Sequence, residues 1–110
     1  VDMFDCVMPT RNGRNAMLFT KHGIMNMRNE KWKYDYSPIE EDGASFVDTL
    51  YSKAYLRHLF VAQELLALEI ASIHNLAFYV WLTQEARKHI LTDDYARWKK
   101  EMLAEVTRRL

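Results

Sequence analysis

The sequence predicts an α+β fold for the isolated chain, mostly helical with a small antiparallel sheet. Two observations support this fold class. Short apolar runs separated by a Gly-containing turn in the first third predict a hairpin, and from Asp48 onward apolar residues recur at helical spacing. A chain of 110 residues is long enough for one small domain with a modest core.

The first elements follow from local patterns. Residues 1–7 are apolar except for two aspartates, which predicts a short buried strand. Residues 9–14 contain Pro9 and the pair Asn12 and Gly13, which predicts a loop. Residues 16–20 and 24–28 are then expected to be two strands joined by a three-residue turn that ends in Gly23.

The central segments carry weaker signals. Residues 29–36 are aromatic and charged, and we expect a single helical turn there. Residues 37–43 contain Pro38, Gly43 and several acids, which predicts an exposed connector. Asp48 is expected to cap a helix over residues 49–60.

The last part of the chain is expected to be helical. Residues 65–73 are apolar on most faces, which fits either a buried helix or a buried extended connector. A helix is expected over residues 73–91. Thr92 is a suitable N-cap for a final helix that ends near residue 107.

Composition excludes some classes of protein. Fifteen basic residues balance fifteen acidic ones, so the overall charge does not indicate a nucleic-acid partner, although residues 1–34 hold six Lys or Arg against three Asp or Glu. Cys6 is the only cysteine, so no internal disulfide is possible. We find no signal peptide and expect no membrane span, because His74, Asn75 and charges interrupt the apolar runs. A cytoplasmic location is the expectation.

One carboxylate and two guanidinium groups lie close together near the N-terminus. Asp5 would end the first strand, and the edge of a strand is where α/β enzymes place catalytic groups. Arg11 and Arg14 follow on the next segment, and their planar forks suit phosphates or base edges. The alternative is that Asp5 caps a turn and that both arginines are solvated.

Residues 1–15, VDMFDCVMPTRNGRN, resemble the nucleophile region of bacterial tRNA-guanine transglycosylase, also called queuine tRNA-ribosyltransferase. The resemblance continues through LFT at 18–20, NMRN at 26–29, YSKAYLRHLF at 51–60 and IHNLAFY at 73–79. It therefore covers nearly the whole chain, with gaps only in the acidic connector and the last helix.

The resemblance implies an enzyme of queuosine biosynthesis. Asp5 would attack C1′ of the wobble guanosine, hold the tRNA covalently, and be displaced by a 7-deazaguanine such as preQ1 or queuine. The substrate would be the anticodon loop of tRNA, and the family is typically a homodimer. The residues that match the anticodon-reading loop are Thr10, Arg11, Asn12, Gly13 and Arg14.

The resemblance also implies a zinc site, from which this chain departs. The family holds zinc with three cysteines spaced C-x-C-x2-C and a later histidine. The corresponding positions here are Gly43, Ser45, Asp48 and His74. We therefore expect no functional zinc. Instead we expect an apolar plug made by Ala44, Phe46, Val47 and Leu50, with His74 as a hydrogen-bonded core residue.

The family fold is a (β/α)8 TIM barrel, which needs roughly 250 residues. The resemblance makes residues 1–15 the last barrel strand with the catalytic and anticodon loop. Residues 16–72 become an inserted subdomain and residues 73–110 the closing barrel helices. A second aspartate that acts as general acid and base, and the base pocket, would lie upstream, so the isolated chain is expected to be inactive.

Two other functions stay open. One is a non-catalytic tRNA-binding or subunit-interaction module, against which the presence of Asp5 counts. The other is a structural helical domain whose arginine segment has no remaining function. The sequence leaves the identity of the deazapurine open.

Overall fold

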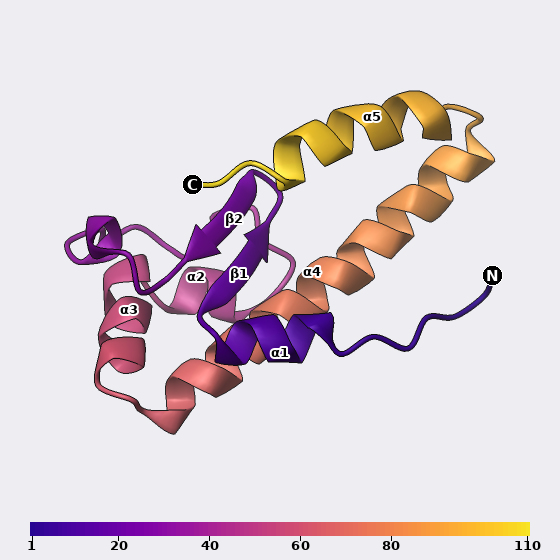
Figure 1. The fold of residues 1–110 in the computed structure, drawn as a ribbon. Helices are drawn as coiled ribbons and strands as arrows, with labels where there is room; N and C mark the ends of the chain where they lie inside the picture. Colours follow the sequence, from indigo (N-terminus) through magenta and orange to yellow (C-terminus); the bar gives the residue numbers. More distant parts are fainter.

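A long helix, α4, forms the spine of the molecule in the computed structural model, which describes residues 1–110 (Figure 1). The hairpin, α1 and α3 lie along its N-terminal half, and α5 folds back beside its C-terminal half (Figure 1). The elements in chain order are α1 Met8–Arg14, β1 Met17–Thr20, β2 Gly23–Asn26, the 3-10 turn η1 Glu30–Trp32, α2 Val47–Leu50, α3 Lys53–Val61, α4 Leu65–Leu91 and α5 Tyr95–Val106.

Helix α4 buries one stripe of its surface against the other elements. Its buried side chains include Ala67, Ile70, Ala71 and Phe78. With 27 residues it is long and apolar enough to cross a membrane by length and composition. However, α4 packs on α1, α3, β1 and α5 within this chain, which is the behaviour of the central helix of a folded domain.

The helical alternative for residues 65–73 is confirmed, because α4 begins at Leu65 and continues without interruption to Leu91. It therefore crosses the border predicted between residues 72 and 73. The division into residues 1–15, 16–72 and 73–110 stays a prediction.

The small antiparallel sheet is confirmed. Strands β1 and β2 pair from Met17 with Asn26 to Thr20 with Gly23, so the turn between them has two residues rather than the three expected. Gly23 has a φ of 147°, and a Cβ atom there would meet the carbonyl oxygen of Arg108. Both facts require glycine at this position. The buried face of the hairpin carries Leu18 and Met25.

For this chain by itself, the predictions for the two N-terminal segments are wrong. Residues 1–7 form no strand and are exposed, with Val1 103% and Phe4 75% exposed. The only sheet is β1–β2, so this segment has no strand to pair with. Residues 9–14 are helical rather than a loop, since Pro9 lies in the first turn of α1, where its fixed φ suits a helix.

The central elements partly follow the predictions. The single helical turn expected within residues 29–36 is confirmed as η1. The helix over residues 49–60 is instead two helices, α2 and α3, separated by extended backbone at Tyr51 and Ser52. Ser52 caps α3, because its Oγ accepts the Tyr55 N–H at 3.1 Å. Asp48 is therefore not the cap of that helix.

Two further corrections concern the connectors. The segment over residues 37–43 is not fully exposed, because Ile39 and Glu40 are buried. Thr92 ends α4 rather than beginning α5. Its hydroxyl donates to Asp94 Oδ1 at 2.6 Å within the tight turn that connects the two helices.

Candidate functional site

The predicted nucleophile lies on an open segment of chain. Asp5 is exposed, and its carboxylate makes no hydrogen bond or ion pair within this chain. Helix α1 begins three residues later at Met8. The Asp5 carboxylate therefore lies on an exposed segment that directly precedes the first turn of α1.

Helix α1 presents a basic surface. Arg11 and Arg14 are exposed and make no ion pair, and their spacing of three residues places them on one side of the helix. Both also lie in the last turn, where the helix dipole favours positive charge. Thr10 and Asn12 are half-buried, and their side chains donate to the carbonyls of Val7 (3.3 Å) and Met8 (3.0 Å).

Gly13 differs from the other predicted RNA-binding residues. It is buried, and a Cβ atom there would lie 3.1 Å from the backbone of Ala71 and Ser72 in α4. Its lack of a side chain therefore serves the close approach of α1 to α4. The arginines remain on the outward side of that contact.

Asn75 of α4 attaches α1 and β1 to the spine. Its Oδ1 accepts the Phe19 N–H at 3.0 Å, and its Nδ2 donates to the carbonyls of Pro9 (3.0 Å) and Met17 (2.9 Å). Asn75 is fully buried, so these bonds occupy its amide where water cannot compete. One of these bonds therefore connects α1 to α4, and the other two connect β1 to α4.

The four positions that correspond to zinc ligands do come together. The Asp48 carboxylate bonds His74 Nδ1 and accepts the Ser45 N–H at 3.0 Å. It also occupies the space beside Gly43, where a Cβ atom would clash with it. Asp48 and His74 are each 1% exposed. The expectation that His74 is a hydrogen-bonded core residue is confirmed.

The hydrogen bonds of His74 define its state. Nε2 lies 2.7 Å from the carbonyl oxygen of Phe19, which can only accept, so Nε2 carries a hydrogen. Nδ1 faces the Asp48 carboxylate. Burial disfavours the charged imidazolium, but the hydrogen bond and the charge of Asp48 together outweigh it and raise the pKa of His74. Asp48 and His74 therefore form a buried ion pair.

Glu40 joins this cluster and was missed by the sequence analysis. It is 5% exposed, and one of its oxygens accepts the Lys21 N–H at 2.7 Å. Burial raises the pKa of Glu40, opposed by the hydrogen bond from Lys21 and the charge of His74. Glu40 lies in an acidic run, which predicts an exposed residue. The polar pair His74 and Asn75 lies inside an apolar helix, and that pattern can be recognised in the sequence.

The predicted apolar plug is wrong. Phe46 is 68% exposed and Leu50 is 62% exposed, whereas Val47 is the member that is buried. The space between the segment over residues 40–48 and α4 is instead filled by the carboxylates of Glu40 and Asp48 and the imidazole of His74. A short α2 helix turns Val47 and Asp48 inward together, which directs their neighbours outward.

The sequence comparisons assign the family. A family model described as queuine tRNA-ribosyltransferase matches residues 1–108. The chain belongs to the queuine tRNA-ribosyltransferase family. The queuine tRNA-ribosyltransferase of Helicobacter pylori strain 26695 is 51% identical over 99% of this chain, and that of Aquifex aeolicus is 44% identical over 100%. The chain spans 29% of the length of each of these relatives.

The residues at the queuine tRNA-ribosyltransferase zinc positions lack the cysteines of a structural zinc cage. All of the buried side-chain nitrogen and oxygen atoms have hydrogen-bond partners, so no orphaned donor atom points to an ion. Glu40, Asp48 and His74 are close enough for their oxygens and nitrogen to share one. Yet both nitrogens of His74 are already engaged, and no thiolate is present to form a structural zinc cage.

Proposed function

We propose that the natural protein containing this chain exchanges guanine for a 7-deazaguanine at the wobble position of tRNA, in queuosine biosynthesis. The observation that carries the proposal is the exposed Asp5 within the family match, followed at once by a helix with two unpaired arginines. The incoming base would be of the preQ1 or queuine type. A homodimer and a cytoplasmic location belong to the same proposal and rest on the family resemblance.

The proposed chemistry is two displacements at one carbon. The Asp5 carboxylate attacks C1′ of the guanosine, the C1′–N9 bond breaks, and guanine leaves after protonation by a general acid. N9 of the incoming deazaguanine then attacks C1′, gives its proton to a base, and expels Asp5. Two inversions retain the configuration, as in retaining glycosidases. The acid and base group would lie in the part of the protein outside this chain.

The surroundings of Asp5 support a barrel context. Val1, Met3 and Phe4 are between 75% and 103% exposed, so three apolar side chains flank the nucleophile without a cover. We propose that residues 1–7 form the last strand of a (β/α)8 barrel. Its neighbouring strands would come from the remaining length that the relatives possess. The 110-residue chain alone is then inactive.

The Asp5 proposal is tested in the natural protein. Asp5→Asn should abolish incorporation of labelled guanine into tRNA, since an amide cannot act as the nucleophile. The same substitution should leave the unfolding transition nearly unchanged, because asparagine has almost the size and shape of aspartate and the Asp5 carboxylate has no hydrogen bond or ion pair within this chain. Asp2→Asn is a matched control on the same exposed segment and should retain exchange.

A covalent intermediate provides the second measurement. Mixing the protein with tRNA and no incoming base should give an adduct that survives denaturing electrophoresis and is absent in Asp5→Asn. Exchange activity that persists in Asp5→Asn would contradict the proposal. In that case, the alternative of a non-catalytic tRNA-binding or subunit-interaction module becomes the better account of this chain.

A further inference from the structure

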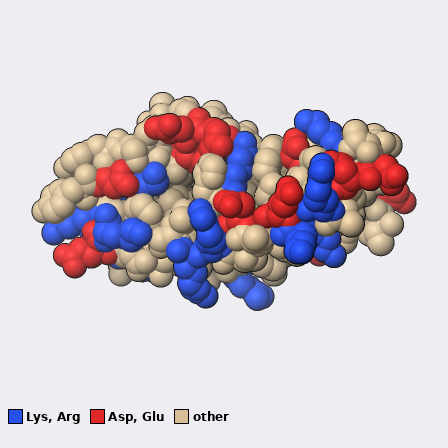
Figure 2. Space-filling view, turned by 90° about the horizontal axis from the view of Figure 1, so that it is seen from above, with Lys and Arg blue, Asp and Glu red and all other residues tan.

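A second group of cations lies beyond α1, where β2 leads into η1 and α3. Arg28, Lys31, Lys33, Lys53 and Arg57 form what we call the basic strip. None of the five has a carboxylate within 4.0 Å, although other cations of the chain do form such pairs. Figure 2 shows Lys and Arg interspersed with Asp and Glu over the face that is seen from above.

Aromatic rings alternate with these cations. The Lys31 and Lys53 Nζ atoms lie 4.7 and 5.8 Å from the centre of the Trp32 ring. The Lys33 Nζ lies 5.4 Å from the centre of the Tyr34 ring. Lysine ammonium groups at such distances are attracted to the ring face, which gathers the charge over η1.

Two of the aromatic side chains are largely exposed to solvent. Tyr34 is 72% exposed and Tyr36 is 74% exposed. Trp32, by contrast, is buried, and its Nε1 donates to the carbonyl of Asn26 at 3.0 Å. Trp32 therefore anchors the turn, whereas both tyrosine rings are exposed and the Tyr34 ring lies beside the Lys33 ammonium group. Exposed rings next to cations are typical of surfaces that bind single-stranded nucleic acid.

The basic strip is continuous with α1. The Arg28 guanidinium donates to the carbonyl of Asn15, the residue that ends α1, at 3.5 Å. Arg57 Nε donates to the carbonyl of Asn29 at 3.0 Å. Positive charge thus extends from the arginines of α1 through Arg28 and Arg57 to the lysines at η1, and the two arginine side chains bond backbone carbonyls along the way.

We propose that the basic strip binds the phosphate backbone of RNA next to the anticodon, and that Tyr34 and Tyr36 stack on unpaired bases there. This inference rests on the proposed tRNA substrate and adds to it a second contact area. An RNA loop suits the surface because its bases are free to stack on aromatic rings, while its phosphates bind unpaired Lys and Arg. The strip would bind regardless of sequence, and α1 would select the anticodon.

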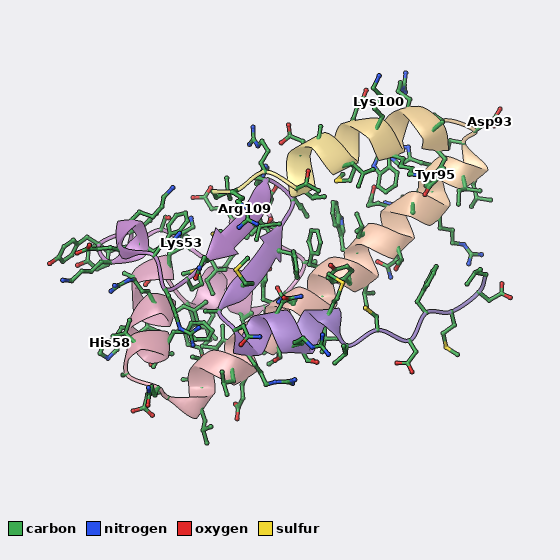
Figure 3. All side chains as sticks on the ribbon, in the orientation of Figure 1. Lys53, His58, Asp93, Tyr95, Lys100 and Arg109 are labelled. Atoms are coloured by element: carbon green, nitrogen blue, oxygen red, sulfur yellow. The ribbon has the colours of Figure 1, made fainter.

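The test uses the natural protein and a short anticodon stem-loop RNA as the probe. The double variant Lys31→Ala/Lys33→Ala removes two exposed charges of the strip. Its matched control is Lys99→Ala/Lys100→Ala on α5, which removes the same charge. Figure 3 shows Lys100 far from Lys53, at the other end of the molecule. Binding is measured by fluorescence anisotropy between about 50 and 200 mM salt.

The strip variant should bind the stem-loop about tenfold more weakly. The slope of log Kd against log salt should fall by between about one and two, because about one counterion is released for each phosphate contact. Tyr34→Ala/Tyr36→Ala should weaken binding by about thirtyfold or more without changing the salt slope, because two stacked rings are lost and stacking releases no counterion. The control on α5 should change neither quantity.

The outcomes separate this inference from the proposed function. If guanine exchange is intact and the strip variant binds RNA like the α5 control, the proposed RNA binding by the basic strip is refuted and the proposed function stands. An equal loss of affinity in both variants also refutes it, since that effect would come from overall charge. A natural protein that exchanges no guanine into tRNA overturns the proposed function itself, and the inference with it.

Discussion

Truncation of His74 to alanine should strongly destabilise the fold. The substitution removes the bond to the Phe19 carbonyl and leaves the Asp48 carboxylate, 1% exposed, without its positive partner. Removing one member of a buried ion pair costs about 3–5 kcal/mol. A small domain has only about 5–15 kcal/mol of stability in total, so the variant should be close to unfolding.

The assay is urea denaturation followed by far-ultraviolet circular dichroism. His58→Ala is the matched control, because His58 is exposed on α3 and makes no side-chain hydrogen bond (Figure 3). Its effect should stay within about 0.5 kcal/mol. If His74→Ala loses no more stability than His58→Ala, the buried ion pair is not what joins the loop to α4.

A double-mutant cycle tests the same pair directly. Asp48→Ala should be strongly destabilising alone, since it leaves the His74 imidazole buried without its carboxylate. Once His74 is already alanine, the same change should be much less costly. The coupling energy should therefore exceed about 1 kcal/mol, as found for residues in direct contact. Additive effects of the two substitutions would contradict the proposed pairing.

Three further predictions concern the same region. The pKa of His74 is raised in the folded state, so its stabilising contribution is complete below the ordinary pKa of about 6.5 and is lost as pH rises through the folded-state pKa. The urea midpoint should therefore fall with rising pH. His74→Ala should lose this dependence on pH. A chelator should leave the urea midpoint unchanged, and metal analysis should find far less than one zinc per chain, whereas a structural zinc would contribute on the order of 10 kcal/mol. Asn75→Ala removes three buried hydrogen bonds and should cost about 3 kcal/mol by the same assay; a loss below about 1 kcal/mol would show that α1 is held by other contacts.

Short-range patterns predicted much of the fold. The hairpin followed from Gly23 between two apolar runs, and the last helices followed from spacing that depends only on neighbours, whereas α1 was predicted to be a loop. The N-terminal segment could not be predicted in the same way. Residues 1–7 have the composition of a buried strand, but a strand needs a partner, and this chain provides none.

The membership of the site was predictable in part, and its chemistry was not. Counting from the family motif identified Asp48 and His74, which do meet. The lack of three cysteines indicated an apolar replacement, whereas the structure has a carboxylate hydrogen-bonded to an imidazole. Glu40 could not be predicted, because its burial depends on how the loop folds over β1. Long-range contacts of this kind leave no periodic mark in the sequence.

The Asp48 carboxylate occupies the space that a Cβ atom at position 43 would need. Any side chain at position 43 would therefore displace the carboxylate from its place beside His74 and Ser45. Position 43 thus limits the orientation of Asp48, and a substitution there acts on the buried pair without touching either of its members.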